Sequence, residues 1–474
     1  MLLYRVHRCD HSTAYTHLCP LLVYCTVNHY ALYICTETRR RGRTYPQRLK
    51  HRLFEEFPVS VRRLKVTLRP RARTGIWLLP IAVLFPILVC GLARGAPASA
   101  IVAPAAERAR DLGVPFHGTP GTYNAITDVA GIEVGQTTLI SGSGKLVTGQ
   151  GPVRTGVTVI LPTGKSGNDA VAAGRAVING TGEWTGMLFV DETGYFFGPI
   201  ALTGTGNIGV THQALVDWAA RPGAVQQDEL FTRLLPLVGE TLDMPLNDVF
   251  GHPLTEQHVL AALNGATSGP VAEGAVGGGT GMIAYEFKGG IGTSSRVVTV
   301  DGKRFTVGVL LQANHGTRHD LRIAGVPVGQ EISDLMPIWK TPAAKSSCLV
   351  VIATDAPLLP HQLQRLARRA ALGFGRNGSF GEDFSGELVL AFSTANRFAY
   401  TQGWKQMNIV NDANEDVLDA LFEAAVDSTE EALVNQLVAA KTMIGADGVT
   451  VYGLPHDRLI ALLKKYGRYS PPQH

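Results

Sequence analysis

The sequence contains little cysteine and few charged side chains, and both shortages narrow what the protein can be. Asp, Glu, Lys and Arg make up 17% of the 474 residues, whereas hydrophobic residues make up 45%. This balance excludes a disordered chain and is enough for one large core or two smaller ones. Four of the six cysteines are Cys9, Cys19, Cys25 and Cys35, and the lack of any C-x2-C pair argues against a zinc site. If the chain is processed after residue 100, only Cys348 remains, so no disulfide framework is expected.

Motifs of several well-known enzyme classes are also missing. No G-x-S-x-G sequence occurs, so the nucleophile turn of an α/β-hydrolase has no place here. Ser141–Lys145 (SGSGK) lacks the first glycine and the Ser or Thr of a phosphate-binding loop, and we interpret it as a hairpin turn. His315 and His319 are four residues apart, but no H-E-x-x-H pattern and no third ligand accompany them. We therefore expect no metal site, and we interpret this pair as part of a solvated loop.

Positive charge is concentrated at the start of the chain. Residues 1–75 contain 15 Lys and Arg against 4 Asp and Glu, a balance of +11, while the whole chain carries +4. The remaining residues therefore carry about 4 − 11 = −7. A nucleic-acid-binding domain needs basic residues clustered on its own surface. We predict no nucleic-acid partner.

A targeting segment is expected at residues 69–100. Three arginines between residues 69 and 73 precede the apolar run Ile76–Ala93, and the sequence ASA at 98–100 offers the small residues that signal peptidase accepts. This pattern favours a secretory signal peptide and an exported, periplasmic protein. A membrane anchor is the alternative, because a run of about 18 apolar residues is at the short limit for spanning. Residues 1–68 form a basic, poorly structured extension without a periodic pattern for helix or strand, as a misassigned start of translation would explain.

From residue 101 onward, strand-like and helix-like segments alternate. Apolar and β-branched runs that end at Gly, Asn or Asp predict strands, and apolar residues at helical spacing predict helices. In His361–Leu372, for example, Leu363 and Leu366 share one face while Arg365 and Arg368 lie opposite. The predicted strands are Val157–Leu161, Phe305–Leu311, Leu349–Ala353 and Leu388–Phe392, and the other predicted helices are Thr211–Ala220, Glu256–Asn264, Val417–Val426 and Glu430–Thr442. The pattern supports mixed α and β structure.

One glycine motif suggests a competing function. Gly204–Gly209 fits G-x-G-x-x-G between a strand-like and a helical stretch, and Asp228 and Glu229 follow about twenty residues on, as in dinucleotide-binding proteins. However, no repeated βαβ units are expected around it, and a glycine-rich turn at a helix N-terminus needs no cofactor. We favour a plain strand-to-helix turn.

Ser347 stands directly before a predicted buried strand, where a serine by itself is an ordinary loop residue. The surrounding sequence is more informative. From about Arg108 to Tyr466 the chain resembles the family of L-aminopeptidase/D-Ala-esterase-amidases and β-peptidyl aminopeptidases. The similar stretches are RARDLGVPFHGTPGTYNAITDVAGIEVGQTTLI, GAVGGGTGM, EFKGGIGTSSR, VGVLLQAN, VVIATDAPLLPHQLQRLARRA and SGELVLAFSTAN.

This resemblance implies an α+β fold, a four-layer αββα sandwich that is shared with ornithine-acetyltransferase-like proteins. It also implies that the precursor cuts itself between Ser346 and Ser347, giving an α chain (101–346) and a β chain (347–474) that begins with the nucleophile. An N-terminal serine carries its own base, because an α-amino group has a reference pKa of about 7.7–8.0 against about 10.4 for lysine. The implied protein is a serine aminopeptidase that acts on peptides, amides or esters without a metal or organic cofactor. The family assembles as tetramers of αβ units, which implies a homo-oligomer.

Four further roles carry over from the family. Asn314 matches the asparagine whose amide donates a hydrogen bond to the oxyanion. Ser385 and Glu387 match a pair that hydrogen-bonds near the nucleophile and its amine. Glu240 matches a carboxylate for the free ammonium group of the substrate. Without the resemblance, each of these residues fits an ordinary turn or edge-strand role.

Two positions depart from the family pattern. Ser346 replaces the usual Gly or Asn, residue types that tolerate a left-handed backbone, so slower or shifted self-cleavage is expected. The second oxyanion donor of the family, a tyrosine, aligns with Leu242, which has no side-chain donor. Losing one donor costs about 100-fold in rate unless another group replaces it, and Tyr285 is a candidate.

Three other functions stay open. A related self-cleaving acetyltransferase of arginine biosynthesis would expose a threonine, whereas this chain has a serine. A nucleotide-binding protein would use the Gly204–Gly209 turn. An uncleaved pseudoenzyme would serve as a binding protein. The sequence also leaves open whether the substrate begins with an L-α-, D-alanyl or β-amino acid, because the shape of the pocket decides that.

Overall fold

The computed structural model describes residues 24–27, 30–33, 107–167, 169–221, 234–338, 347–398 and 414–472. The chain divides into two units, residues 1–97 and 98–474. In the first unit, β1 (Tyr24–Val27) and β2 (Tyr30–Tyr33) form an antiparallel hairpin. These two strands lie within the basic extension at residues 1–68. The rest of that extension, the targeting segment at 69–100 and Ser346 lie outside the described residues.

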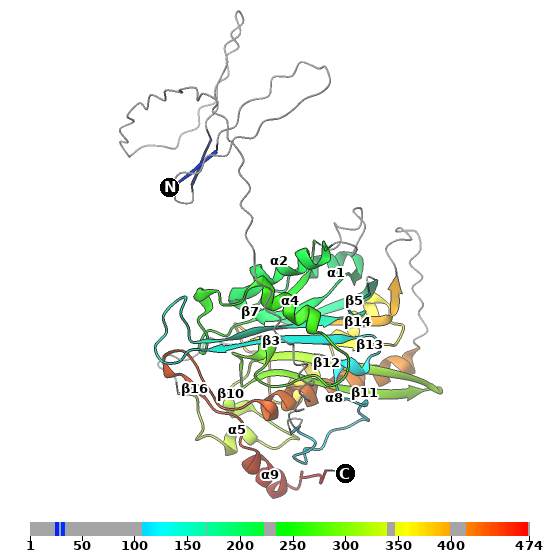
Figure 1. The fold of residues 1–474 in the computed structure, drawn as a ribbon. Coiled ribbons are helices and arrows are strands. Elements are labelled where there is room, and N and C mark those ends of the chain that lie inside the picture. Colours follow the sequence, from blue (N-terminus) through cyan, green and yellow to red (C-terminus); the bar gives the residue numbers. More distant parts are fainter. Residues whose placement is uncertain are drawn as a thin grey trace, which may run out of the picture. The chain divides into compact units, whose positions relative to one another are not determined.

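Two β-sheets form the middle of the second unit (Figure 1). Most neighbouring strands are antiparallel, but β13 and β14 are parallel in the larger sheet, and β7 and β8 are parallel in the smaller one. In sheet order, the larger sheet contains β11 (Gly290–Val300), β12 (Lys303–Asn314), β13 (Ser347–Thr354), β14 (Gly386–Phe398), β5 (Ala170–Gly180) and β6 (Tyr195–Phe196). The smaller sheet contains β3 (Glu133–Ser141), β4 (Val153–Leu161), β7 (Ile200–Gly204) and β8 (Leu237–Thr241).

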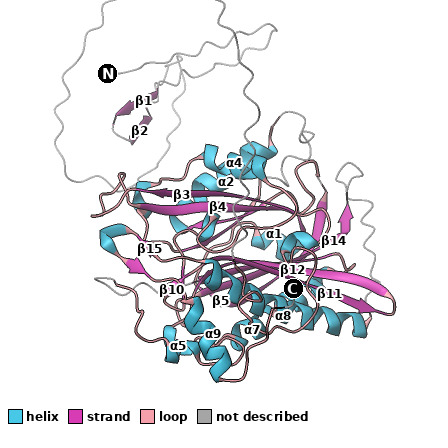
Figure 2. Cartoon of the chain, turned by 60° about the horizontal axis from the view of Figure 1, so that its bottom comes forward, coloured by secondary structure: helices cyan, strands magenta, loops and turns pink. Residues whose placement is uncertain are grey.

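Helices cover the outer face of each sheet, which produces four layers (Figures 1 and 2). The smaller sheet is covered by α2 (Ile208–Ala219) and α4 (Glu256–Gly265). The larger sheet is covered by α6 (Pro360–Ala367), α7 (Ala370–Arg376) and α8 (Glu415–Ala439). Among the described residues, the other α-helices are α1 (Met187–Thr193), α5 (Val328–Glu331) and α9 (His456–Lys465), and the other strands form two short hairpins, β9 (Ile283–Ala284) with β10 (Phe287–Lys288) and β15 (Met443–Ile444) with β16 (Thr450–Val451). This architecture confirms the α+β, four-layer αββα sandwich.

The alternation of side chains along β13 shows why its sequence is apolar throughout. Cys348 and Val350 point into the core between the larger sheet and its helices. Leu349 and Val351 point into the core between the two sheets, together with Leu202 of the smaller sheet. A strand that is buried on both faces needs a continuous apolar run rather than an alternating one. The same run places Ser347 at the buried end of a central strand.

Three helix predictions were wrong in their bounds. The predicted helix His361–Leu372 is two helices, α6 and α7, because the chain turns at Arg368 and Arg369, where Arg369 N bonds to Leu366 O at 3.0 Å. The predicted helices Val417–Val426 and Glu430–Thr442 are instead one continuous helix, α8. The polar residues between them are buried and do not end the helix: Asp427 pairs with Arg376, and the Thr429 hydroxyl donates to Ala425 O of the preceding turn at 2.7 Å.

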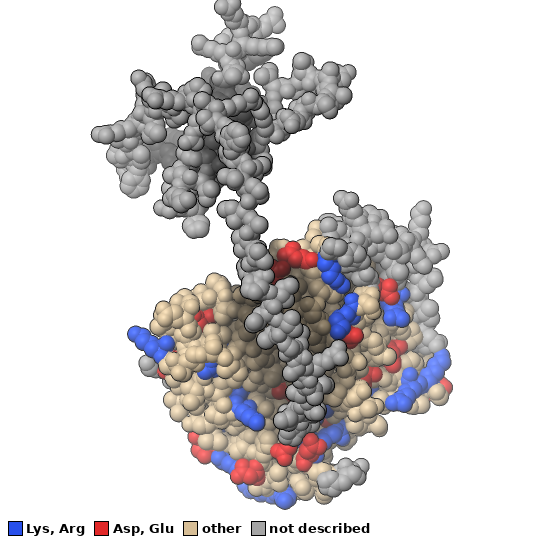
Figure 3. Space-filling model, in the orientation of Figure 1, with Lys and Arg blue, Asp and Glu red and all other residues tan. Residues whose placement is uncertain are grey.

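The described surface carries charges of both signs. On the face in Figure 3, lysines and arginines are interspersed with aspartates and glutamates rather than gathered in one patch. Among the described residues, no helix is long and apolar enough to cross a membrane. The apolar run Ile76–Ala93 lies outside that part of the chain.

Candidate active site

Ser347 is the first residue of β13, and the register of the sheet places it between two neighbouring strands. Its partner in antiparallel β12 is Asn314, and its partner in parallel β14 is Gly386. Ser347 Oγ accepts a hydrogen bond from Gly386 N at 3.3 Å. The Ser347 side chain is 7% exposed. Three strands that are distant in the sequence therefore meet at Ser347.

The carboxamide of Asn314 is held in a single orientation beside this serine. Its Oδ1 accepts from Ile283 N at 2.8 Å, and its Nδ2 donates to the Leu242 carbonyl oxygen at 2.9 Å. A main-chain N–H can only donate and a carbonyl can only accept, so the amide cannot be flipped. One hydrogen of Nδ2 is left over for another acceptor, as an oxyanion donor requires. Leu242 thus takes part through its main chain, although its side chain cannot donate.

Tyr285 does not supply the missing second donor. Its ring is fully buried in the core between the larger sheet and the helices, where its centroid lies 5.0 Å from that of His315. Cys348 belongs to the same core. Successive residues of a strand face opposite sides of the sheet, so the Ser347 side chain is directed away from Tyr285. The suggestion that Tyr285 replaces the family tyrosine was wrong.

Ser385 and Glu387 form a buried pair on either side of Gly386. Ser385 Oγ donates a hydrogen bond to Glu387 Oε1, and both side chains are fully buried. Burial raises the pKa of the Glu387 carboxyl to about 7; the Ser385 hydroxyl opposes this shift, and the nearby Glu382 carboxylate adds to it. A carboxyl with such a pKa can take up or release a proton near neutral pH. Because Gly386 N bonds to Ser347 Oγ, this pair flanks the main-chain group that holds the serine.

Glu240 lies on the smaller sheet, in β8. Its carboxylate accepts from Glu183 N at 2.9 Å and from the Thr205 hydroxyl. A β-carbon added at Gly182 would lie 3.5 Å from both Glu240 Oε1 and Gly386 Cα. The carboxylate therefore lies close to the strand residue that contacts Ser347, across the junction of the two sheets.

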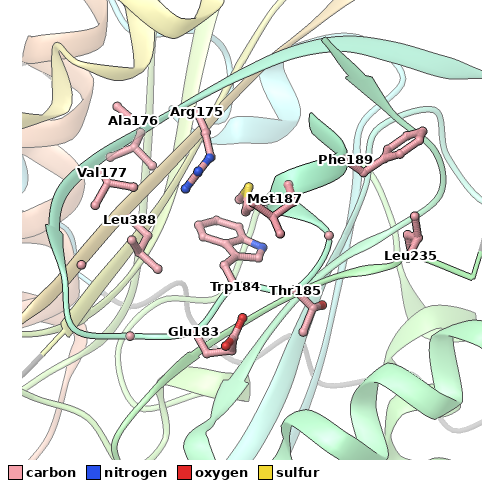
Figure 4. Close-up of a pocket in the computed structure, with 15 residues that line it drawn as sticks. Arg175, Ala176, Val177, Glu183, Trp184, Thr185, Met187, Phe189, Leu235 and Leu388 are labelled. Carbon is pink, nitrogen blue, oxygen red and sulfur yellow. The ribbon is translucent and has the colours of Figure 1, made fainter. Parts of the chain in front are cut away.

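A cavity of about 410 Å³ lies beside Glu183, whose main-chain N–H donates to this carboxylate (Figure 4). In Figure 4 the Trp184 ring stands in the middle, with Leu388 and Val177 on one side and Phe189 and Leu235 on the other. Gly182 and Glu183 also line the cavity, so it continues directly from the Glu240 region. Its walls are mainly apolar, and Arg175 and Glu183 are the charged residues that line it, which is the usual character of a small-molecule site.

His315 and His319 do not share a solvated loop, and that interpretation was wrong for the first of them. His319 is 78% exposed, whereas His315 is fully buried between the rings of Tyr285 and Phe374. Neither ring nitrogen of His315 has a hydrogen-bond partner in the part of the chain that the structure describes. Burial lowers the pKa of His315 to about 4. Within that same part, no three His, Cys, Asp or Glu side chains are grouped to hold a metal ion.

The glycine motif at 204–209 connects β7 to α2, as a strand-to-helix turn. Together with β8 it forms one βαβ unit, which the sequence did not predict. A β-carbon at Gly204 would lie 2.3 Å from Asp243 Oδ2, and the Thr205 hydroxyl bonds to Glu240. Two carboxylates beside the turn repel a phosphate group. The SGSGK sequence lies between paired β3 and β4, as the hairpin interpretation predicts.

The contacts that orient the site are largely main-chain groups that the sequence analysis did not identify: Gly386 N, Ile283 N and the Leu242 carbonyl. No sequence signal marks them, because every residue except proline offers the same N–H and C=O. Their roles come from strand register and from turns.

A two-sheet sandwich with a serine at the head of a central strand fits the class of hydrolases with an N-terminal nucleophile. The L-aminopeptidase D-Ala-esterase/amidase of Ochrobactrum anthropi, described as a prototype for the serine aminopeptidases and a variant of the Ntn hydrolase fold, superimposes with a TM-score of 0.70 and 46% identity, covering 77% of this chain and 99% of that one. A β-aminopeptidase of Burkholderia sp. gives a TM-score of 0.68 and 44% identity, covering 76% and 99%.

The sequence comparisons agree with this class. The sequence model of the family described as "Peptidase family S58" matches residues 124–451 of this chain. The β-peptidyl aminopeptidase BapA of Sphingosinicella xenopeptidilytica is 62% identical over 370 residues, which is 76% of this chain and 92% of that protein. The chain belongs to peptidase family S58. It is a hydrolase with aminopeptidase activity, and the acetyltransferase, nucleotide-binding and pseudoenzyme alternatives are not favoured.

Proposed function

We propose that this aminopeptidase is made as a precursor, cleaves itself between Ser346 and Ser347, and then uses Ser347 to release N-terminal β-amino acids. The observation that carries the proposal is the register that sets Ser347 between Asn314 and Gly386. A nucleophile and a fixed amide donor on adjacent strands are the two parts that acyl transfer requires. The Ser346–Ser347 bond is the one whose cleavage turns Ser347 into a chain terminus.

The reaction proceeds through a seryl ester. The free amine of Ser347 takes the Oγ proton as Oγ attacks the substrate carbonyl carbon, and the oxyanion accepts a hydrogen bond from Asn314 Nδ2. The C–N bond then breaks, and the leaving amine receives the proton. Water attacks the ester, which releases the amino acid and returns the proton to Ser347. The Ser385–Glu387 pair flanks Gly386 and is the group that exchanges protons near the amine, because its carboxyl can take up or release a proton near neutral pH.

Substrate selection rests on Glu240 and on the cavity beside it. The ammonium group of the substrate pairs with the Glu240 carboxylate, and the side chain enters the pocket that contains Trp184. A β-amino acid has one more carbon between its amine and its carbonyl than an α-amino acid, so the distance from Glu240 to Ser347 sets the preference. The name and 62% identity of the Sphingosinicella relative support the β-amino acid as the preferred substrate.

Export and assembly belong to the same proposal. The segment at 69–100 directs the protein to the periplasm, with membrane anchoring as the alternative, and residues 1–68 are not part of the mature protein. The mature αβ units, 101–346 and 347–474, associate as a homo-oligomer, a tetramer by analogy with the family. Ser346 is expected to slow self-cleavage, since serine adopts a left-handed backbone less readily than Gly or Asn.

Intact mass and N-terminal sequencing of the purified protein test the proposal, with Ser347→Ala as the uncut control. We expect a fragment of residues 347–474 that begins with Ser347, and faster hydrolysis of a β-aminoacyl anilide than of L-α- or D-alanyl anilides. An uncut wild-type chain that hydrolyses an aminoacyl anilide would refute the self-cleavage step. A preference for the L-α- or D-alanyl substrate would refute the β-amino acid assignment alone.

A further inference from the structure

Lys288 is a fully buried lysine whose charge the active-site chemistry described above does not use. It lies in the short strand β10, and its Nζ donates to the carbonyl oxygens of Met282 at 2.5 Å and Gly289 at 2.7 Å. Within the described part of the chain no salt bridge reaches it, and burial lowers its pKa to about 7. A buried cation without a carboxylate partner is costly, so its retention calls for a reason beyond packing.

One peptide group connects this lysine to the oxyanion donor. The carbonyl oxygen of the Met282–Ile283 peptide accepts from Lys288 Nζ, and the N–H of the same peptide donates to Asn314 Oδ1 at 2.8 Å. Asn314 Nδ2 is the group proposed to face the substrate oxygen. The ammonium group, the peptide and the carboxamide thus form an unbroken chain of hydrogen bonds that ends at the reacting carbonyl.

The hairpin that contains Lys288 does not depend on the ammonium group for its shape. Gly289 N also donates to Met282 O, at 3.0 Å, and Lys288 N donates to Tyr452 O at 2.7 Å. Ile283 and Lys288 are cross-strand partners in the β9–β10 pair. Main-chain bonds therefore already fix the Met282–Ile283 peptide, and the Lys288 side chain adds a charge next to its carbonyl oxygen.

We propose that Lys288 is a positioning residue that polarises the Met282–Ile283 peptide and thereby strengthens the hydrogen bond from Asn314 to the oxyanion. A cation on the carbonyl oxygen makes the N–H of the same peptide a stronger donor, and each bond in such a chain strengthens the next. A strengthened donor matters most when the substrate oxygen becomes negative, so the effect falls on the transition state and not on substrate binding. This inference rests on the proposed roles of Ser347 and Asn314.

The test compares Lys288→Met, which removes charge and donor, with Lys288→Gln, which removes the charge but keeps a donor. Each fully processed enzyme is assayed at pH 6.5 for kcat and KM, and for binding of an aminoacyl aldehyde and of the free amino acid product. The aldehyde forms an oxyanion-like adduct with a serine, whereas the product only occupies the site. Lys441→Met, at an exposed position, serves as the matched control.

We expect Lys288→Met to lower kcat and aldehyde affinity by about tenfold each, less than the 100- to 1,000-fold cost of removing an oxyanion donor. Lys288→Gln should lower kcat and aldehyde affinity by a smaller factor. In both variants, KM and product affinity should change less than twofold. In an Asn314→Ala background, the Lys288→Met change should have little further effect on kcat, because the relay ends at Asn314.

The outcomes separate this inference from the proposed function. If Asn314→Ala leaves kcat unchanged, the assigned oxyanion site is wrong. If Asn314→Ala lowers kcat but both Lys288 variants match the wild type, only the lysine relay is wrong. Three results would mean that Lys288 has a structural role, and each would overturn the inference. They are an equal loss of aldehyde and product affinity, an effect on kcat that adds to that of Asn314→Ala, and failure of both Lys288 variants to fold.

Discussion

Replacing His315 by leucine is expected to make the fold more resistant to mild acid. His315 is fully buried, its ring lies 5.0 Å from that of Tyr285 and 5.3 Å from that of Phe374, and burial lowers its pKa to about 4. In the unfolded chain a histidine titrates at about 6.5. Between these two values the unfolded chain binds a proton that the folded protein does not, so stability falls as the pH drops.

The size of the effect follows from the shift in pKa. A difference of about 2.5 pKa units corresponds to about 3 kcal/mol of unfolding free energy. The folded protein keeps this stability above pH 6.5 and loses it as the pH falls to about 4. Leucine is close to histidine in volume and cannot take up a proton, so the variant lacks this loss. Burial raises the pKa of Asp243 to about 6 and that of Glu387 to about 7. These two carboxyl groups add to the stability of the folded state as the pH falls, and they do so equally in the wild type and in the variant. Only the difference between the two proteins isolates His315.

Urea unfolding midpoints at several pH values between 4 and 7 measure that difference. The gap between His315→Leu and the wild type should shift in favour of the variant by about 3 kcal/mol from pH 7 to pH 4. His319→Leu is the matched control, because that side chain is 78% exposed, and it should follow the wild type at every pH. A constant gap between His315→Leu and the wild type would refute the argument from burial.

Two other substitutions test the site and the packing. Glu240→Gln should raise KM about 10- to 100-fold for substrates with a free amine while changing kcat less, because it removes a charged hydrogen bond made before the reaction begins. A desamino analogue should bind to both forms equally, and a fall in kcat alone would contradict the role of Glu240. Gly174→Ala should lower the free energy of unfolding by about 1–3 kcal/mol in thermal or urea unfolding, since its β-carbon would lie 2.4 and 2.5 Å from main-chain atoms of α6. Gly209→Ala, where nothing lies within 4 Å, is the control, and equal stability of the two variants would show that the strand has shifted to accept the methyl group.

Each of the four predicted strands lies within an observed strand, because each one depends on a local run of apolar residues. The predicted strand Leu349–Ala353 lies within β13, and Leu388–Phe392 lies within β14. Helix boundaries were harder to predict. The polar stretch after Val426 predicts a helix end, but Asp427 pairs with Arg376, and buried Glu431 pairs with Arg296 at 2.7 Å. Those partners come from elsewhere in the chain, so no local pattern contains them.

The same limit applies to single side chains. His315 resembles a loop residue in the sequence, since its neighbours Asn314 and Gly316 are typical of turns. Its burial results from the packing of Tyr285 and Phe374 around it, and those residues are far from it in the sequence. Likewise, Leu242 has no side-chain donor, yet its carbonyl orients Asn314.

The sequence by itself determined the mixed α and β composition, the buried strand that follows Ser347, and, through resemblance, the residues to examine. Tertiary structure alone decided which of them meet. Pairing of β12, β13 and β14 sets Asn314 and Gly386 beside Ser347, and a turn connects Lys288 to Asn314 through one peptide group. The physical reason is that secondary-structure propensity depends on a few neighbouring residues, whereas strand register depends on the packing of the whole sheet.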